Sequence, residues 1–517
     1  MKKILFLLPL FAFSVLNAQD SLRSKWTEIE FEKKSLDYYM PSYLNQFDSI
    51  NIGNSTINYF QNNNHFKDVF TTKKSNGFGI QSERFATVNN WKFYGKFSFS
   101  KYEDKETGFT GMANPYRDNP YMIADSTTNA DWKKQHYLIQ AQIITPEITK
   151  GLRAGTGVKY EILNGARQID PRPLDKSLDL NLTPFLLYNT NRWNFGINGY
   201  YNHYREDISI SLENIQQPKN LYKLIGLGEY LYNQPLIVTT GLTRKYNGNS
   251  YGGGLTIGYR LNSKNMLQLN GELYSTKEIV TDGVSNPYKA GNHNQDVLKG
   301  TISYQLKEDR ANHIINLSSQ HRKSKNREYI QLLNPETSQY DEIYNSVMHH
   351  QLNNSIILNY DVLLKDDKHL PSWNLGTGLR YTYLDEQYPT TNFRVEINQY
   401  YVNGFAKKWF NLKKGNLLVG YSTTLKVLGD NLLRFTEEPK LTNFVAKSIL
   451  YPNFAFETTG YWTNQFEVQY TLPAFRNSNS QLYFKINYQN MTSTQRMLES
   501  AKGLSNNYLN FTIGLFN

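Results

Sequence analysis

The residues best suited to acid–base catalysis or metal binding do not form a recognisable set in this sequence. His349 and His350 are adjacent, so in an extended strand they point to opposite faces and cannot bind one metal ion together. His136 and His203 each occur alone near a predicted strand end. The sequence contains neither H-E-x-x-H nor G-x-S-x-G, the spacings typical of zinc and serine hydrolases.

Two acidic pairs and a glycine run are the remaining candidates for chemistry. Asp366-Asp367 and Glu437-Glu438 fall in predicted connections, where acids are usually solvated. Gly252-Gly253-Gly254 lacks the helix that follows a phosphate-binding loop, and we expect it to let a strand bend. The sequence therefore predicts no catalytic, cofactor-binding or metal-binding residues, and we expect a protein that is not an enzyme.

Charged residues at every second position indicate a different chemistry, the attraction of ions within a pore. An excess of lumen-facing cations would raise the local anion concentration. Charges on neighbouring strands could instead pair as structural ladders, the interpretation that we favour. The predicted lumen-facing charges are Lys92, Lys96, Arg153, Lys159, Arg260, Arg380 and Lys485, with Glu161, Asp179 and Glu272 as the acids.

These charges need strands of about ten residues to hold them on one face. Trp91–Ser100 alternates aromatic residues with lysine and serine, and Trp193–Asn202 and Leu482–Gln489 repeat the division. Such runs predict an all-β protein, a transmembrane antiparallel β-barrel. A soluble β-sandwich or propeller would also alternate, but its strands are usually shorter, around five or six residues.

Short and long connections alternate along the chain, as short periplasmic turns and long extracellular loops do in such barrels. We predict about 18–20 strands, because the runs Leu221–Leu231 and Ile50–Phe60 alternate poorly. Short turns are predicted near Val88–Asn90, Pro146–Lys150, Asn189–Asn191, Asn262–Lys264, Asp309–Asn312, Asn411–Gly415 and Pro473–Asn479. Long loops are predicted at Glu103–Lys133, Asn164–Lys176, Asp207–Lys219, Thr281–Gln295, Lys325–Ser346 and about Leu428–Gly460.

The N-terminal residues predict export. Lys2 and Lys3, the following apolar residues and a small-residue boundary at Ala18 indicate a cleavable signal peptide over residues 1–18. Residues 19–49 are predicted to be a short periplasmic segment and residues 50–517 the barrel. Because the sequence contains no cysteine, we expect no lipid anchor, disulfide or thiolate metal site.

The composition also fits a barrel. Mean hydropathy is −0.59, yet aromatic residues make up 14% of the chain, with 39 tyrosines. A barrel reconciles these values, because only alternate strand residues face lipid and because Tyr and Trp gather at both membrane interfaces. The net charge of +11 would suit nucleic acid, anionic headgroups or anionic solutes, and the signal peptide argues against nucleic acid.

A barrel of this width has a lumen that its inward side chains alone do not fill. The roughly 30 residues before the first strand are too few for a separate plug domain. We therefore expect a lumen that is open, narrowed by inserted loops or closed by another protein. The first long loop is the candidate constriction, or equally a cap or a partner contact, through Met112, Tyr116, Tyr121 and Met122.

Three segments resemble an uncharacterised family of Bacteroidota outer-membrane barrels. They are Ser75–Gly79, Asn89–Phe97 and the C-terminal Tyr508–Phe516, which looks like an outer-membrane insertion signal except that its Phe516 is out of step with the apolar face. The resemblance implies an outer-membrane location and an accessory role in an envelope system.

Two function classes follow. The first is a channel or transport-associated barrel for hydrophilic solutes. The second is a non-conducting scaffold that docks lipoproteins or a larger envelope transport or secretion complex. Either would contact outer-membrane lipid and lipopolysaccharide, and neither requires a cofactor.

Overall fold

The computed structural model describes most of the chain. The described residues are 20–34, 42–45, 50–214, 216, 219–231, 236–238, 241–436, 443–474, 480–494 and 503–517. The predicted signal peptide, the acidic pair Glu437-Glu438 and most of the predicted turn Pro473–Asn479 lie outside these residues.

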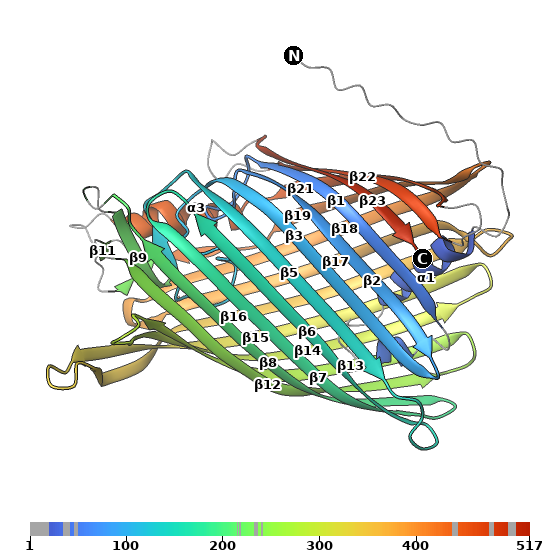
Figure 1. The fold of residues 1–517 in the computed structure, drawn as a ribbon, viewed down its shortest axis with the longest axis horizontal. Coiled ribbons are helices and arrows are strands. Elements are labelled where there is room, and N and C mark those ends of the chain that lie inside the picture. The colour runs from blue at the N-terminus through green and yellow to red at the C-terminus, as the bar shows by residue number, and fades with distance from the viewer. Residues whose placement is uncertain are drawn as a thin grey trace, which may run out of the picture.

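Eighteen antiparallel strands form a closed barrel, as the sequence predicts (Figure 1). Each strand pairs with the next along the chain, and β1 pairs with β23 to close the wall. The wall strands are β1 (Asn51–Asn64), β2 (Lys74–Val88), β3 (Trp91–Thr107), β5 (Ala130–Ile144), β6 (Leu152–Arg167), β7 (Arg172–Asn189), β8 (Trp193–Ser211), β12 (Leu242–Arg260), β13 (Asn265–Asp282), β14 (Tyr288–Lys307), β15 (Ala311–Leu333), β16 (Tyr340–Lys365), β17 (Pro371–Tyr388), β18 (Phe393–Leu412), β19 (Gly415–Leu428), β21 (Tyr461–Pro473), β22 (Gln481–Ser493) and β23 (Ser505–Phe516).

The other elements are short. β4, β9, β10 and β11 form a small separate sheet, and β20 adds to the end of β18. The elements outside the wall are α1 (Asp20–Lys33), α2 (Ser42–Asn45), β4 (Ile123–Asp125), β9 (Lys219–Gly226), β10 (Glu229–Tyr230), β11 (Leu236–Val238), η2 (Pro389–Thr391), β20 (Leu432–Arg434), η3 (Ala446–Leu450) and α3 (Tyr451–Glu457). None of the described helices is long and apolar enough to cross a membrane.

The outer face of the wall is apolar, which confirms the predicted alternation. Phe97 on β3, Ile197 on β8 and Ile513 on β23 are 43%, 56% and 53% exposed. On β3, the neighbouring inward positions Lys92 and Tyr94 are buried. Because a broad apolar exterior of this kind needs lipid around it, the barrel is transmembrane.

The connections are partly those predicted. The turn between β2 and β3 is two residues long, and the connection between β19 and β21 is a long segment that carries β20, η3 and α3. The predicted loops Asn164–Lys176, Thr281–Gln295 and Lys325–Ser346 are wrong, because strands continue through most of each range. Beyond the lipid both faces of a strand meet water, so the polar–apolar alternation that identifies a strand is lost there.

The two weakest strand predictions have opposite outcomes. The run Ile50–Phe60 falls largely within β1, which joins the wall. The run Leu221–Leu231 does not join it, because β9 pairs with β4, β10 and β11 instead. Leu221 and Leu224 are buried in apolar clusters rather than facing lipid, which explains why their spacing is not that of a wall strand.

Candidate functional site in the lumen

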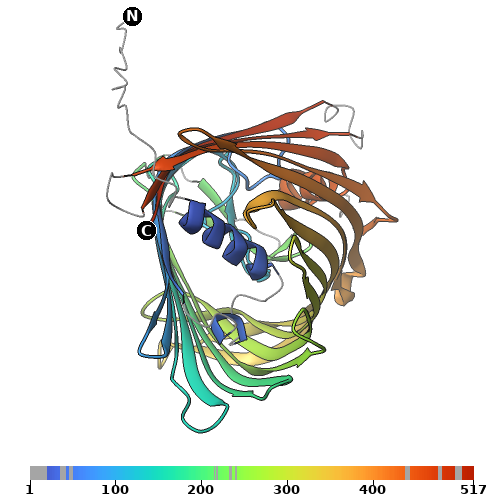
Figure 2. The ribbon, with the colours of Figure 1, turned by 90° about the vertical axis from the view of Figure 1, so that its right-hand side faces the viewer.

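Two parts of the chain occupy the lumen at different levels. Figure 2 looks along the barrel from the end with the short turns and shows α1 lying across the opening. The connection between β3 and β5, residues 108–129, folds into the half of the lumen farther from the short turns, together with the small sheet. The candidate site is therefore the lumen and what these two obstructions leave of it.

Helix α1 is fixed by aromatic packing against two opposite sides of the wall. Trp26 lies 6.1 Å from the rings of both Phe85 on β2 and Phe516 on β23. Toward the other end of the helix, Phe31 is buried in a cluster with Ile314 and Leu363 on β15 and β16. These contacts lie on opposite sides of the lumen, so α1 crosses the lumen from one side of the wall to the other, and we call it the crossbar.

Charged side chains surround this crossbar. Lys307 and Lys365 on the wall pair with Glu32 and Glu28 of α1 at 2.6 and 2.7 Å, and Lys33 pairs with Glu83. Just after the helix, Lys34 lies 2.7 Å from Asp361. Burial lowers the pKa of Lys34, and the ion pair with Asp361 opposes that effect only in part. Placing Lys34 beside the wall therefore carries a desolvation cost.

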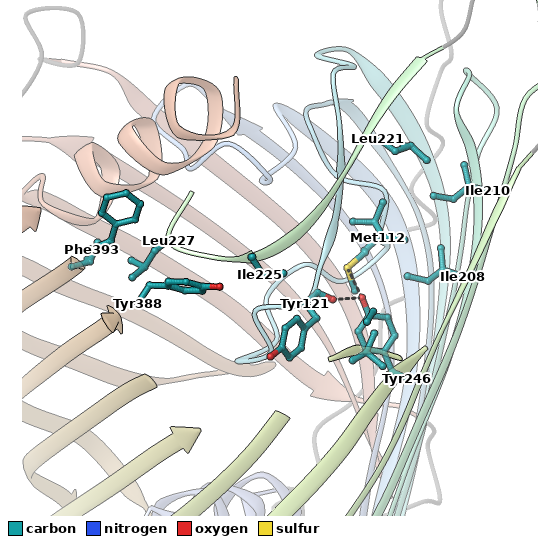
Figure 3. Close-up of a cluster of buried hydrophobic side chains, with 14 of the residues drawn as sticks. Met112, Tyr121, Ile208, Ile210, Leu221, Ile225, Leu227, Tyr246, Tyr388 and Phe393 are labelled. Carbon is teal, nitrogen blue, oxygen red and sulfur yellow. Dashed lines mark hydrogen bonds between the residues drawn. The ribbon is translucent and has the colours of Figure 1, made fainter. Parts of the chain in front are cut away.

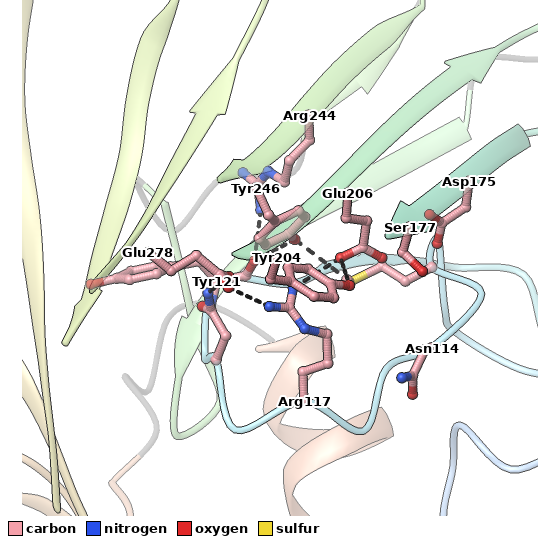
Figure 4. Close-up of polar contacts among 12 residues, drawn as sticks. Asn114, Arg117, Tyr121, Asp175, Ser177, Tyr204, Glu206, Arg244, Tyr246 and Glu278 are labelled. Atoms are coloured by element: carbon pink, nitrogen blue, oxygen red, sulfur yellow. Dashed lines mark hydrogen bonds and ion pairs between the residues drawn. The ribbon is translucent and has the colours of Figure 1, made fainter. Parts of the chain in front are cut away.

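The inward loop is held by Arg117 (Figure 4). Its guanidinium donates to Glu206 on β8 at 2.9 Å and to Glu278 on β13, and it stacks 3.6 Å from the ring centre of Tyr204. Although burial alone would lower the pKa of Arg117, Glu278 and Glu206 keep it above its usual value. A buried charge with two acidic partners is costly to break, so these contacts fix the loop within the lumen.

Other buried ionic contacts fix the same loop along its length. Arg167 on β6 pairs with Asp125 at 2.7 Å, with both side chains almost fully buried. Arg244 on β12 pairs with Asp282 at 2.7 Å and also donates to the carbonyl oxygen of Tyr121. Each arginine satisfies backbone or carboxylate oxygens that would otherwise be buried without a donor.

An apolar cluster lies under the loop (Figure 3). Tyr246 on β12 donates to the Tyr121 carbonyl at 2.6 Å and contacts the sulfur of Met112 at 3.6 Å. Ile208 on β8 and Leu221 on β9 complete one side of the cluster. Burial of these side chains ties the small sheet and the loop into one body.

Two cavities remain on either side of residues 115–119. The larger has a volume of about 710 Å³ and lies against β3 to β14, and the smaller, about 440 Å³, lies against β16 to β18 and α3. Five acidic residues line each cavity, and because Asp118 lines both, the two cavities together have nine. The lysines and arginines in the two described linings are only Arg117 and Lys134. The described lining of this half of the lumen is therefore acidic.

The ten predicted lumen charges lie on inward positions, and several of them pair. Lys159 lies 2.5 Å from Glu161 and 3.5 Å from Asp179. Glu272 pairs with Lys299 at 3.1 Å, and Lys485 with Glu467 at 3.0 Å. These contacts run between neighbouring strands or along one strand, as a structural ladder would.

The other predicted charges have different surroundings. Lys92 donates to the Asn45 carbonyl of α2 at 3.0 Å, and Arg380 stacks 3.8 Å from the ring centre of Tyr401. Lys96 lies opposite Glu83 in the strand register. Arg153 and Arg260 lie at the short-turn end and line one cavity there.

The four predicted loop residues do not behave alike. Met112 and Tyr121 are buried within the lumen, and Met122 packs against the same cluster. Tyr116 is 59% exposed, and its hydroxyl donates to Asp68 in the connection between β1 and β2 at 2.9 Å. The inward part of the loop is therefore centred on Met112 and Tyr121, with Tyr116 facing the cavities.

The residues predicted to lie in the lumen do not include Trp26, Phe31, Arg117 or Phe516, which the structure places there. One signal was available, because Leu22, Trp26 and Ile29 have helical spacing. Phe516 is out of step with its apolar neighbours because it faces inward, where it stacks 4.7 Å from Tyr483. His349, which the sequence left without a role, bonds to Asn326 and to Glu386 at 2.7 Å.

No group of three or more potential metal ligands occurs among the residues that the structure describes. Several histidines form hydrogen bonds between neighbouring strands of the wall. His136, for example, lies 2.7 Å from Glu161.

Solved structures that are similar to the barrel include a receptor and a transporter, both at very low identity. The ferric preacinetobactin receptor BauA from Acinetobacter baumannii matches with 9% identity and a TM-score of 0.40, over 90% of this chain and 80% of that one. The FrpB iron transporter from Neisseria meningitidis matches with 10% identity and a TM-score of 0.39, over 94% and 83%. We draw no functional conclusion from likeness at this level.

Curated proteins and family models give different results. The comparison with curated proteins finds no match. A family model covers residues 41–517, which include every wall strand and α2. The chain therefore belongs to the family of unknown function DUF6850.

Proposed function

We propose that this protein is a transport barrel of the bacterial outer membrane that passes small hydrophilic solutes. Residues 108–129 are its fixed constriction, and α1 is a movable gate at the periplasmic end. The observation that carries the proposal is the contrast between the two obstructions. The loop is held by fully buried ion pairs such as Arg167 with Asp125, whereas α1 combines the buried packing of Trp26 and Phe31 with ion pairs that reach water, such as Lys307 with Glu32.

The polar lumen supports passage of hydrophilic solutes. Cavities remain on both sides of the constriction, and their walls carry Tyr, Asn and acidic side chains. Such walls hydrogen-bond to water and to hydroxyl-bearing solutes, and the acids favour neutral or cationic solutes over anions in this half. The apolar exterior and the predicted signal peptide support the outer-membrane location, and an origin in Bacteroidota stays a prediction from the sequence.

Planar-bilayer recording with and without the helix tests this function. We expect the intact barrel to show small or rare steps, and a variant lacking residues 20–34 to show larger, stable ones, because the crossbar no longer spans the lumen. Liposome swelling with sugars of increasing size gives the cutoff that the constriction sets. The matched control is Lys25→Gln, which changes an exposed side chain of α1 and leaves the crossbar in place.

A deletion variant that folds but stays silent in both assays would refute the gate and favour a scaffold.

One observation already favours a scaffold. The hairpin of β15 and β16 extends beyond the rest of the wall and exposes Leu332 and Ile343 to 63% and 61%. Exposed apolar side chains on such a projection are a place where an outer-membrane partner, such as a lipoprotein, could dock.

A further inference from the structure

A separate cavity lies at the short-turn end of the lumen, beside α2. It has a volume of about 380 Å³ and lies among β3, β6, the turn between β7 and β8, and the ends of β12 to β14. Its described lining carries six lysines and arginines and one acid, Glu147. This end therefore has the opposite charge to the cavities around the constriction.

The three lysines of this lining have partners. Lys92 donates to the Asn45 carbonyl, Lys264 lies 3.8 Å from Asp309, and Lys307 pairs with Glu32 at 2.6 Å. The lysines thus contribute positive potential, but each already uses part of its hydrogen-bonding capacity on a protein partner.

The three arginines are different. Arg153 pairs through Nη2 with the half-exposed Glu147 at 3.6 Å, but its Nε and Nη1 are buried without a hydrogen-bond partner. Arg192 and Arg260 are adjacent, since the backbone N–H of Arg260 donates to the Arg192 carbonyl at 2.8 Å. No ion pair of Arg192 or Arg260 occurs among the described residues. Arg192 and Arg260 are exposed, so water screens part of the repulsion among the three guanidinium groups, and an anion between them would lower it further.

We propose that Arg153, Arg192 and Arg260 form a binding site for an oxyanion, either a phosphate or a carboxylate group. The planar guanidinium fork matches both groups with two parallel hydrogen bonds, which a lysine cannot do. The cavity is large enough for the oxyanion together with the rest of a small solute. The group has two possible sources, a free solute in the periplasm or the headgroup of an anionic lipid at the inner rim.

This site does not depend on the proposed gate, because it stands on residues of the wall and its turns. Failure of the conductance experiment would leave it intact, and failure of the binding experiment would leave the gate intact. The two ideas can therefore be tested in the same preparation and judged separately.

Equilibrium dialysis of the detergent-solubilised full barrel against radiolabelled inorganic phosphate tests the site. We compare the intact protein with the triple variant Arg153→Gln, Arg192→Gln and Arg260→Gln. The control variant is Lys368→Gln, Lys413→Gln and Lys414→Gln, which removes the same charge from two other turns at the same end. A second arm uses native mass spectrometry to measure retained phosphatidylglycerol.

We expect phosphate to bind the intact and control proteins, and the triple variant to bind at least about tenfold more weakly. Added salt should weaken binding in the intact protein. Retention of phosphatidylglycerol that the triple variant loses, without phosphate binding, would support the oxyanion site and assign it to lipid. Equal binding by the intact protein and the triple variant, or no binding in either arm, would overturn the proposal.

Discussion

Arg117 shows what a single side chain contributes to this lumen. It comes from a loop, yet it is neutralised by acids on two wall strands, Glu206 and Glu278. The facing of those two acids follows from strand alternation, so the sequence can place them in the lumen. The sequence cannot identify their partner, because the contact joins residues 89 and 161 positions apart. Pairing at this scale depends on how the loop folds.

Replacing Arg117 by methionine tests the constriction. Glu206 and Glu278 would lose their buried partner, so docking of the loop should weaken by about 3–5 kcal/mol. We expect a higher single-channel conductance and a larger sugar cutoff in liposome swelling, measured in the helix-deleted background.

The matched control is Arg205→Met on β8, the strand that carries Glu206. Arg205 is 59% exposed and pairs with Asp207 on the outer face. If R117M and R205M have the same cutoff, Arg117 does not hold the constriction.

At the scale of elements, the sequence predicts wall strands well where lipid lies outside and water inside. Residues Trp91–Ser100 show this, because every outward position there is aromatic or glycine. The sequence predicts strands poorly where that contrast ends. For this reason Asn164–Lys176 is predicted as a loop, and the alternation in Leu221–Leu231 is ambiguous. Helix α1 was missed as a lumen element, because its partners Phe85 and Phe516 lie far along the chain.

The docking of α1 can be tested by trypsin, which cleaves after Lys25, Lys33 and Lys34 when the helix leaves the lumen. Replacing Trp26 and Phe31 by alanine removes the buried aromatic contacts of the helix with both sides of the wall. Each loss costs about 3–5 kcal/mol of docking energy. We expect cleavage at least tenfold faster in the double variant than in the intact barrel.

Ile148→Ala serves as the control for this experiment, because Ile148 is 59% exposed on a turn at the same end. Cleavage at the same rate in all three proteins would mean that the aromatic contacts do not hold α1.

At the scale of the whole molecule, the two faces of the wall meet different solvents. This property is the most predictable from the sequence, because it is repeated in strand after strand and does not depend on any single contact. The content of the lumen is less predictable, because it is built by connections, whose course the alternation does not specify. The candidate site in the lumen therefore cannot be predicted from the sequence pattern alone.

Phe97→Lys tests the lipid face. A lysine there costs about 2–4 kcal/mol near mid-membrane, so we expect a lower yield of assembled barrel. The fraction with heat-modifiable migration on gels measures it. Ser98→Lys, the next residue on β3, places the same charge toward the lumen and should assemble normally. Equal yields for the two variants would contradict the assigned facing.

The seat of α1 has a consequence for the order of assembly. Its aromatic contacts come from β2 at one end of the chain and from β22 and β23 at the other, and these strands become neighbours only when β1 pairs with β23. The surface that receives Trp26 is therefore complete only when this seam has closed. We expect full docking of α1 in the lumen to follow closure of the wall.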